Sequence, residues 1–597
     1  MKTKNAFLGL SALLLVSPAV PQTLPLGPGQ SAPLSVDYGE AEKDLTDFIQ
    51  KKMDKLKVKG LSIALMDGTG VVWVKGFGFA DVAQGTPATG DTLYPLGSPT
   101  KLFTAGEILK LEGEGKVRLD EPIQNDIPGF SVQSRFKRTK PITLRALLAN
   151  HSGLPGFFIK GAMAKEPQSL ADFVTDLKSD YLTAPPQTLY KYSYVDYDLL
   201  GRVIELKRKM NFEEAMERDW LRPLGMDASS FRWTPGLEAK LAKGYLHGNP
   251  TPLFHLRDVP AVGLVTNVND MARFLCFVLG ARRPESSPIL GSQAVDLMFE
   301  PQYAGNPLNF GHEVGIGWML SGLNVEGSEG TAWHDGVYPP YVSEMAVLNR
   351  QKLGVVLLAN SEDAIKITDD ITIRALKLML NAKYGLKLSL EKKKRPMSKT
   401  VEVPGEKLDH DTGFYSAAGQ LTSVTRRGDH LSTELLHTGL DLVPISQDTF
   451  VPRFTLFFLF PIDFPENTMT FSTVEGHDVT VFNGFNYPIV LEKIAPVPLP
   501  DSWRKRMGDY LLENPDDWIN FEKVSLTEKE GFLTIVMKVS FPAFGIKGRE
   551  YKVALKPLSN EDAVDPGLFY GDGGTLHAVE EGGVTRVYYS GYWFRKQ

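Results

Sequence analysis

The sequence predicts an α+β chain in which one mixed sheet covered by helices precedes two antiparallel β domains. Three observations lead to this prediction. A helix and a hairpin open the first 390 residues, a helical middle follows, and apolar strands return near residue 350. Beyond residue 404 the sequence is almost wholly strand and turn. A weak internal repeat divides this second part into two halves.

The chain of 597 residues is too long for a single hydrophobic core. At roughly 100–200 residues per domain, about two to four domains are expected. Hydrophobic residues make up 43% and charged residues 23%, as in soluble globular proteins. The net charge of −6 provides no basic field for a phosphate backbone. We therefore expect a small-molecule or peptide partner and no nucleic acid.

Residues 1–20 are predicted to be a signal peptide. Lys2 and Lys4 precede an apolar run at 6–16, and Ser17-Pro18-Ala19 offers a small-residue cleavage site. This run is shorter than the roughly 20 apolar residues of a membrane span, so an uncleaved membrane anchor is the alternative. Residues 21–36, rich in Pro and Gly, are predicted to be a linker. Because of the predicted signal peptide, we expect a secreted or periplasmic protein. Cys276 is the only cysteine, so no intrachain disulfide can form, and export without disulfides suits a bacterial protein.

Residues 37–390 are predicted to form the first domain. Residues 40–56 place Leu45, Phe48, Ile49 and Met53 on one face of a helix. The β-rich segments 61–66 and 71–76 are separated by a turn at 67–70, which predicts a hairpin. Segments 345–348 and 354–359 are expected to return to the same sheet, and Cys276 is expected in a core helix at 271–279.

A basic run within 391–404 is predicted to be a solvated linker, with a nucleic-acid or membrane patch as the alternative. It leads to β domains at 405–497 and 498–597, each a small barrel or sandwich, with strands expected at 532–540 and 585–589. The motif at 412–415 (TGFY) recurs at 507–510 (MGDY), and 482–485 is echoed at 589–592. The phenylalanine-rich run 454–464 is predicted to be a buried strand or, alternatively, a contact surface against the first domain.

Ser98 and Lys101 are the candidate nucleophile and base. Residues i and i+3 share one face of a helix, so an unprotonated Lys101 can accept the Ser98 proton. The spacing alone is unspecific, because the pairs Ser389/Lys392 and Ser502/Lys505 also show it in charged sequence.

Three more segments follow in an order that gives this pair its meaning: 147–155 (LLANHSGLP), Tyr192-Ser193-Tyr194 and His334-Asp335-Gly336. With them, the chain resembles the class C β-lactamase and penicillin-binding-protein-like serine hydrolases over about residues 60–360. The resemblance implies a β-lactamase/transpeptidase-like domain with a helical subdomain. The layout of one catalytic domain and two β domains resembles the D-aminopeptidase branch.

By this resemblance, Ser98, Lys101, Tyr192 and His334 are the catalytic residues. An ammonium at Lys101 would push Tyr192 toward phenolate and make it a second candidate base. His334 would hydrogen-bond the tyrosine or steer the substrate. Gly336 would leave room for the substrate, and the backbone N–H groups of Ser98 and Val337 would face the oxyanion. The resemblance implies neither a metal nor a cofactor.

Two substrate-facing positions depart from the family pattern. Tyr194 stands where an asparagine amide usually holds a substrate carbonyl, so a hydrogen-bond partner is lost and the cleft is narrowed. Asp335 stands where a small hydroxyl residue or glycine is common, and its carboxylate would repel a substrate carboxylate. Both departures argue against true β-lactamase activity.

The sequence therefore predicts a secreted serine hydrolase that forms an acyl-enzyme on esters, or on amides and peptides with small or D-configured residues. One alternative is a D-aminopeptidase or a D-Ala carboxypeptidase-like peptidoglycan enzyme, and Asp335 would favour the former by attracting a substrate ammonium. Another is a catalytically inactive binding or scaffold protein on the same fold. We also expect the β domains to contact the catalytic cleft.

Overall fold

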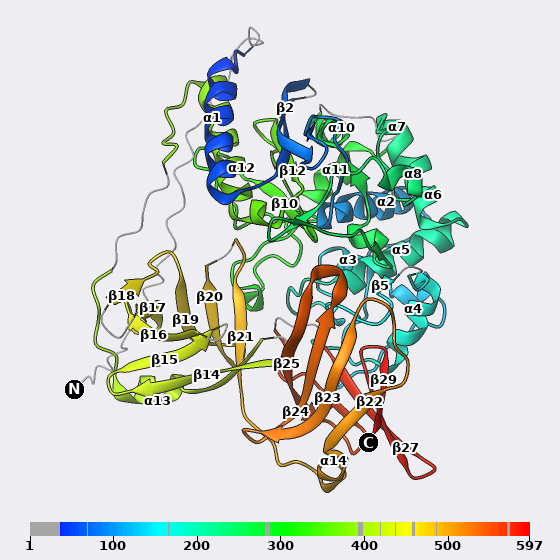
Figure 1. Cartoon of the computed structure of the whole chain (residues 1–597), viewed down its shortest axis with the longest axis vertical. Coiled ribbons are helices and arrows are strands. Elements are labelled where there is room, and N and C mark those ends of the chain that lie inside the picture. The colour runs from blue at the N-terminus through cyan, green and yellow to red at the C-terminus, as the bar shows by residue number, and fades with distance from the viewer. Residues whose placement is uncertain are drawn as a thin grey trace, which may run out of the picture.

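The computed structural model (Figure 1) describes residues 36–68, 70–164, 167–280, 287, 289–391, 398–417, 419–435, 438–456, 460–484, 486–569 and 573–597. The expected signal peptide, nearly all of the 21–36 linker and residues 392–397 of the basic linker lie outside these ranges. So do residues 457–459 of the phenylalanine-rich run and Phe485 of the second repeat motif. The predicted α+β layout is confirmed: a first part with helices and a sheet precedes two antiparallel β domains.

The central sheet of the first part has the strand order β10-β11-β12-β1-β2-β3. The strands are β1 (Gly60–Asp67), β2 (Gly70–Asp81), β3 (Thr86–Pro87), β10 (Ala332–Tyr338), β11 (Tyr341–Leu348) and β12 (Leu353–Ala359). The sequence predicted a mixed sheet, but all the pairings are antiparallel. Tight turns join β1 to β2, β10 to β11 and β11 to β12, and a tight turn can only connect antiparallel strands.

Helices cover both faces of this sheet, which explains why β11 and β12 are buried along their whole length and why all their residues except Ser343 and Glu344 of β11 are apolar or glycine. On one face, α1 (Gly39–Leu56) and α12 (Thr368–Tyr384) pack through one hydrophobic core. The apolar side of α1 consists of Ala41, Leu45, Ile49 and Met53, whereas Phe48 is only partly buried. On the other face lie α10 (Val268–Leu279) and α2 (Lys101–Gly113). Cys276 of α10 is half-buried beside this second core.

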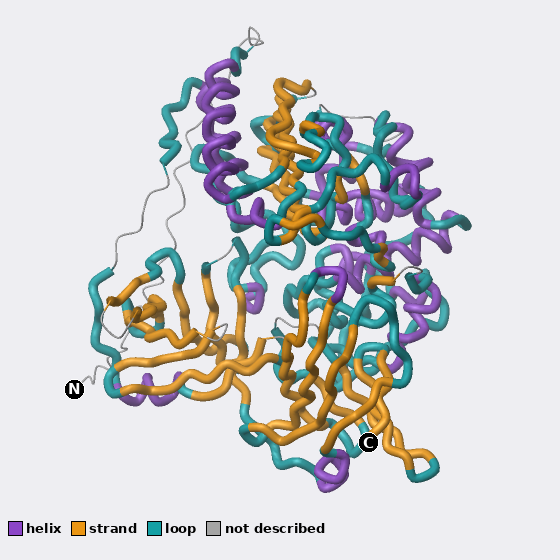
Figure 2. The backbone as a smooth tube through the Cα atoms, viewed as in Figure 1, coloured by secondary structure: helices purple, strands orange, loops and turns teal. Residues whose placement is uncertain are grey.

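A helical region between β3 and β10 extends the second core. Its helices are α3 (Leu144–Leu148), α4 (Leu170–Asp176), α5 (Tyr194–Arg208), α6 (Phe212–Met216), α7 (Arg222–Leu224), α8 (Pro235–Glu238), α9 (Val259–Val262) and α11 (Ser292–Met298). Its short strands are β4 (Tyr94–Pro95), β5 (Met163–Ala164), β6 (Tyr245–Leu246), β7 (Asn249–Pro250), β8 (His255–Leu256) and β9 (Val265–Thr266). Figure 2 shows this helical region beside the sheet.

The first β domain begins with α13 (Gly405–Asp411). Its strands are β13 (Gly413–Ala417), β14 (Gln420–Arg427), β15 (His430–Leu435), β16 (Thr438–Pro444), β17 (Thr449–Leu456), β18 (Phe460–Asp463), β19 (Thr468–Val474), β20 (His477–Asn483) and β21 (Ile489–Ile494). Their order is β16-β15-β14-β13-β21-β20-β19-β17-β18, and β16 also pairs with β17. Strand pairing therefore closes on itself, with β18 attached at the side of β17.

The second β domain is a closed barrel that begins with α14 (Asp501–Arg506). Its strands are β22 (Gly508–Leu512), β23 (Asn520–Lys529), β24 (Phe532–Phe541), β25 (Ile546–Pro557), β26 (Asp562–Val564), β27 (Thr575–Glu581), β28 (Val584–Tyr589) and β29 (Tyr592–Lys596). Closure is completed where β22 pairs with β29.

The first motif of the internal repeat is the same structural device in both β domains. A short helix, α13 or α14, is followed by Gly413 (φ 138°) or Gly508 (φ 137°) at the start of a strand. Two residues later a buried tyrosine donates its hydroxyl to the carbonyl four residues before it: Tyr415 to Asp411 at 2.9 Å and Tyr510 to Arg506 at 2.6 Å. The hydroxyl thus ties each helix to its first strand.

Both β domains pack against the first part of the chain, below it in Figures 1 and 2. The Arg135 guanidinium donates to the backbone carbonyls of Asp565 and Gly567 in the barrel. The backbone N–H of Tyr181 donates to Thr575 Oγ1 at 2.9 Å. At the first β domain, Gly322 lies directly against Asn486. Of the helices in the described ranges, none combines the length and apolarity needed to cross a bilayer.

Candidate active site

Ser98 lies at the start of η1 (Ser98–Thr100), directly before α2, at the edge of the central sheet. Gly97 precedes it with φ 71° and ψ −146°, a conformation that favours glycine. A Cβ at Gly97 would also come within 2.9 Å of the Val337 nitrogen. This close approach brings the nucleophile and strand β10 together.

Lys101, the first residue of α2, extends its amine back toward Ser98. Its Nζ lies 3.5 Å from Ser98 Oγ and donates to the Ala261 carbonyl at 3.2 Å. The side chain is 1% exposed. Burial lowers the pKa of Lys101 to about 7, although carboxylates led by Asp198 act in the opposite direction. A substantial neutral fraction at neutral pH makes this amine a competent base.

Tyr192 lies on the segment that leads into α5 and is positioned by its neighbours. Ser193 caps α5 by accepting from the Asp196 N–H at 3.1 Å, and Asn150 Nδ2 donates to the Ser193 carbonyl at 3.2 Å. The Lys101 ammonium nitrogen lies 4.8 Å from the centre of the Tyr192 ring. The motif is therefore anchored on the segment that begins at Asn150.

The expectation that Tyr192 tends toward phenolate is wrong. Burial raises the pKa of Tyr192 well above its ordinary value, while a hydrogen bond with the Ser98 side chain acts weakly in the opposite direction. Desolvation of the phenolate is the largest effect, and it outweighs the opposing hydrogen bond. Tyr192 is therefore a phenol at neutral pH, able to donate and relay a proton, and Lys101 is the better base.

His334 lies on β10, with its ring centre 6.4 Å from that of Tyr192. Its Nδ1 lies 2.7 Å from the Asp335 carbonyl oxygen, so the proton is on Nδ1. Burial lowers the pKa of His334 to about 3, and Lys101 adds to this effect. The His334 ring is therefore neutral. It lies near the Tyr192 ring, but no hydrogen bond joins the two side chains in the described structure.

The backbone N–H of Val337, the predicted oxyanion donor, is oriented by edge strand β10. The N–H and C=O of Trp333 pair outward with Met319, away from β11. Because backbone groups alternate along a strand, the Asp335 and Val337 N–H groups also point to this outer edge. Gly336 packs so closely that a Cβ would lie 2.5 Å from the Leu96 carbonyl oxygen. The Val337 N–H therefore faces the cleft beside Ser98.

Tyr194 and Asp335, the two departures from the family pattern, both line the Ser98 pocket. The Lys101 amine lies 4.4 Å from the centre of the Tyr194 ring, closer than to the Tyr192 ring. The face of the Tyr194 ring thus stands where the family pattern has an asparagine amide. This ring favours the ammonium form of Lys101. Burial raises the pKa of Asp335 to about 6, so its carboxylate is mostly charged at pH 7.

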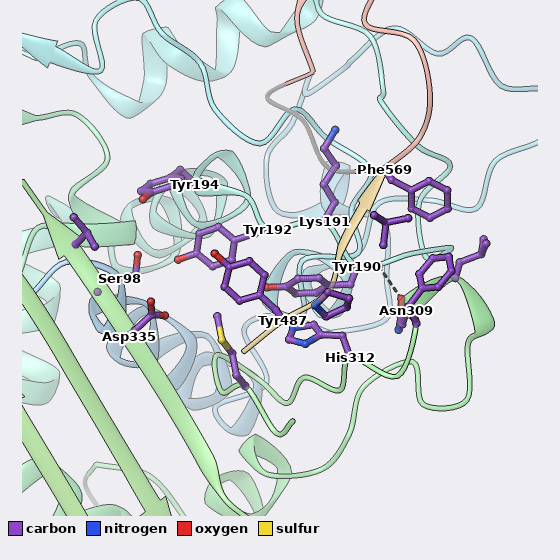
Figure 3. A pocket seen from close by; sticks show the side chains of 17 residues that line it. Ser98, Tyr190, Lys191, Tyr192, Tyr194, Asn309, His312, Asp335, Tyr487 and Phe569 are labelled. Carbon is purple, nitrogen blue, oxygen red and sulfur yellow. Dashed lines mark hydrogen bonds between the residues drawn. The ribbon is translucent and has the colours of Figure 1, made fainter. Parts of the chain in front are cut away.

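The pocket also contains residues that the sequence did not indicate (Figure 3). They include His312 from the first part of the chain, called the catalytic part from here on, and Tyr487 and Phe569 from the β domains. Tyr190, which the sequence offered as an alternative to Tyr192, lines the pocket as well. Tyr190 and His312 have ring centres 4.5 Å apart. Burial lowers the pKa of His312 to about 4, and its Nε2 has no hydrogen-bond partner among the described residues. No motif marks His312, Tyr487 or Phe569, and the last two lie far from the catalytic motifs in sequence.

Metal ligation and the second Ser/Lys pair complete the description of candidate chemistry. Within the described ranges, no group of three or more His, Cys, Asp or Glu side chains is placed to hold a metal ion. Ser502 of the Ser502/Lys505 pair lies on α14 in the barrel and donates to Asn560 Oδ1 at 2.9 Å. It is remote from the Ser98 pocket and its lining residues.

Comparison with known proteins gives consistent matches. A family model described as Beta-lactamase matches residues 45–378, more than half of the chain. Protein flp of Staphylococcus aureus (strain N315) is 27% identical over 327 residues, covering 54% of this chain and 63% of flp. The unguisins hydrolase ungD' of Aspergillus campestris is 28% identical over 339 residues, covering 54% of this chain and 62% of that protein.

Among solved structures, the octameric penicillin-binding protein homologue from Pyrococcus abyssi has a TM-score of 0.51 at 24% identity. The match covers 76% of this chain and 100% of the homologue, and it shows a shared fold. The chain spans about 63% of the length of the first curated relatives that it matches.

Proposed function

The chain belongs to the β-lactamase family of serine hydrolases, and from this premise we propose that it hydrolyses esters, or amides and peptides with small or D-configured residues. The reaction passes through an acyl-enzyme on Ser98. The observation that carries the proposal is the buried Lys101 amine, 3.5 Å from Ser98 Oγ and with a pKa of about 7. A lysine with an ordinary pKa would be almost wholly protonated at neutral pH and could not accept the serine proton.

In the proposed mechanism, neutral Lys101 takes the Ser98 proton as Oγ attacks the substrate carbonyl carbon. The negative charge that develops on the carbonyl oxygen is met by the Ser98 and Val337 N–H groups. The bond to the leaving group then breaks, and the leaving oxygen or nitrogen receives a proton from the Lys101 ammonium through the Tyr192 phenol. In the second half, water attacks the acyl carbon while the Lys101 amine takes its proton. The bond between the acyl carbon and Oγ then breaks, and the Lys101 ammonium returns the proton to Oγ.

Asp335 narrows the substrate class. Its carboxylate is mostly charged above pH 6 and lines the pocket beside Gly336. A substrate carboxylate placed there would be repelled, whereas a neutral ester or a free ammonium would not. This favours neutral esters and aminopeptidase-type substrates over D-Ala carboxypeptidase and β-lactam substrates. Export through residues 1–20 stays a prediction of the sequence.

The proposal is tested by activity and covalent labelling of the full chain. The unmodified protein should hydrolyse neutral esters or D-amino-acid amides faster than carboxylate-bearing β-lactams. A fluorescent phosphonate should label Ser98, as located by peptide mass spectrometry. Ser98→Ala should lose the label and at least about a thousandfold of the hydrolysis rate, because the nucleophile is gone.

Ser502→Ala is the matched control, since Ser502 also has a lysine three residues later on a helix. It should keep both label and rate. Full hydrolysis by Ser98→Ala would overturn the proposal. Absence of any adduct and any turnover across the panel would favour the inactive scaffold.

A further inference from the structure

The two β domains supply part of the lining of the Ser98 pocket, including Tyr487 and Phe569, which Figure 3 labels. Tyr487, Pro488 and Val490 come from the β20–β21 connection and the start of β21 in the first β domain. Phe569 comes from the segment after β26 in the barrel. The catalytic part supplies Tyr190, Phe310 and other lining residues. The cavity is therefore composite, with contributions from all three parts of the chain.

The segment 565–569, which carries Phe569, is held from two directions. Arg135 Nη2 donates to the Gly567 carbonyl at 2.6 Å, and its Nη1 donates to the Asp565 carbonyl at 3.2 Å. From the first β domain, Glu492 Oε2 accepts from the Leu568 N–H at 2.7 Å. Glu492 Oε1 is in turn 2.7 Å from His477 Nδ1. These contacts fix the backbone on which the Phe569 side chain stands.

The Phe569 ring is packed at the junction of the three parts and is 7% exposed. It makes edge-to-face contacts with Phe310 of the catalytic part (5.6 Å) and with His477 of the first β domain (6.0 Å). The same apolar cluster contains Leu189 and Val490. Rings in such contacts are rigidly placed, so the part of the pocket lining around Phe569 is preformed.

The cavity has the size and lining of a site for an aromatic ring. Its volume is about 190 Å³, and an apolar cavity of roughly 150 Å³ accepts a benzene molecule. Its aromatic members are Tyr190, Tyr192, Tyr194, Phe310, Tyr487 and Phe569. Rings at the wall of an apolar site gain from edge-to-face or stacked contact with a bound ring.

We infer that a cluster of rings from all three parts of the chain, Phe310, Tyr487 and Phe569, is a substrate subsite of the Ser98 pocket that selects an aromatic or similarly bulky apolar group. This inference rests on the proposed function, because it assigns a substrate class to the Ser98 site. It makes the β domains part of substrate recognition.

The test compares three neutral esters by proton release: ethyl acetate, ethyl phenylacetate and benzyl acetate. The first has no ring, the second carries a ring on the acyl side and the third on the leaving side. For the unmodified chain, kcat/KM of at least one ring-bearing ester should exceed that of ethyl acetate by about tenfold or more. In Tyr487→Ala and in Phe310→Ala this ratio should fall by about tenfold, because each variant removes one ring contact.

Phe464→Ala is the matched control, because Phe464 is an exposed phenylalanine of the first β domain outside the pocket. Its ester ratio should equal that of the unmodified chain. Phe569→Leu, which retains apolar volume, serves as a third variant in case a full truncation at the domain junction impairs folding. Phenylacetamide should also slow phosphonate labelling of Ser98 at concentrations where acetamide does not.

An unchanged ratio in Tyr487→Ala, Phe310→Ala and Phe569→Leu would overturn the subsite while leaving Ser98-dependent hydrolysis intact. Equal protection by the two amides would also count against it. Hydrolysis that survives Ser98→Ala would instead overturn the proposed function. The two failures are therefore distinguishable.

Discussion

At the residue scale, burial sets the protonation of the reacting groups. It lowers the pKa of Lys101 to about 7 and that of His334 to about 3, and it raises the pKa of Tyr192. Desolvation disfavours every charged form, so the amine and the imidazole tend to be neutral and the phenol keeps its proton. Near neutral pH the site thus combines a base, Lys101, that is partly neutral with a proton relay, Tyr192, that is uncharged.

The pH dependence of hydrolysis follows from Lys101. We expect kcat/KM for a neutral ester to rise about tenfold per pH unit below pH 7 and to level off above it, as Lys101 loses its proton. The His334→Gln variant should keep this rising limb of the pH–rate profile at the same pH, whatever its absolute rate. The reason is that His334 is already neutral at pH 5. A pH–rate profile measures both. A limb that moved or vanished in His334→Gln would assign the base to His334.

The same group links stability to pH. Because the folded pKa of Lys101 lies below its unfolded value, the unfolded state binds more protons between about pH 7 and pH 10, and this contribution to stability rises with pH in that window.

The four catalytic candidates could be predicted from sequence because short motifs mark each of them. The structure brings Ser98, Lys101, Tyr192 and His334 to one sheet edge. The state of the Tyr192 proton could not be predicted, since it depends on how deeply residues remote in sequence bury the ring. His312 was missed because an isolated histidine without a motif carries no signal of its place in a pocket.

At the scale of elements, edge strand β10 and the turn at Gly97 determine what the nucleophile faces. Periodicity predicted α1, β1 and β12 closely, but the predicted segments 71–76 and 345–348 cover only parts of β2 and β11. It did not predict that β10 lies at the sheet edge, because strand order arises from packing across more than 250 residues of sequence separation. The short repeat around Tyr415 and Tyr510 was visible in the sequence, but its hydrogen bonds were not.

The helix-to-strand tie at Tyr510 gives a test at this scale. Tyr510→Phe removes the 2.6 Å bond to the Arg506 carbonyl and should destabilise this end of the barrel by about 1 kcal/mol. Amide hydrogen exchange followed by mass spectrometry should show faster exchange in peptides from α14 and β22. The control is Tyr551→Phe, because Tyr551 is a half-buried tyrosine of β25. This variant should leave exchange in the α14 and β22 peptides unchanged. Equal exchange in both variants would contradict this role for the hydroxyl.

At the scale of the whole molecule, the pocket is completed only when three separately built parts pack together. Sequence suggested that the β domains contact the cleft, but it could not identify Tyr487 or Phe569. Neither residue belongs to a catalytic motif, and their positions depend on contacts such as Arg135 to Gly567. By our proposals, specificity resides at the domain interfaces, whereas the chemistry resides in the catalytic part.

Gly322 tests this dependence on domain packing. It has φ 97°, and a Cβ there would lie 1.7 Å from the Asn486 carbonyl oxygen, next to Tyr487. Gly322→Ala should therefore displace the β20–β21 connection, speed hydrogen exchange in that peptide and reduce the preference for ring-bearing esters about tenfold. Gly330→Ala is the matched control: Gly330 has φ 117°, so the backbone strain is comparable, but a Cβ there meets no atom within 4 Å. If both variants changed ester preference equally, strain within the catalytic part would explain the effect. A loss confined to Gly322→Ala would show that the contact between the catalytic part and the first β domain sets substrate preference.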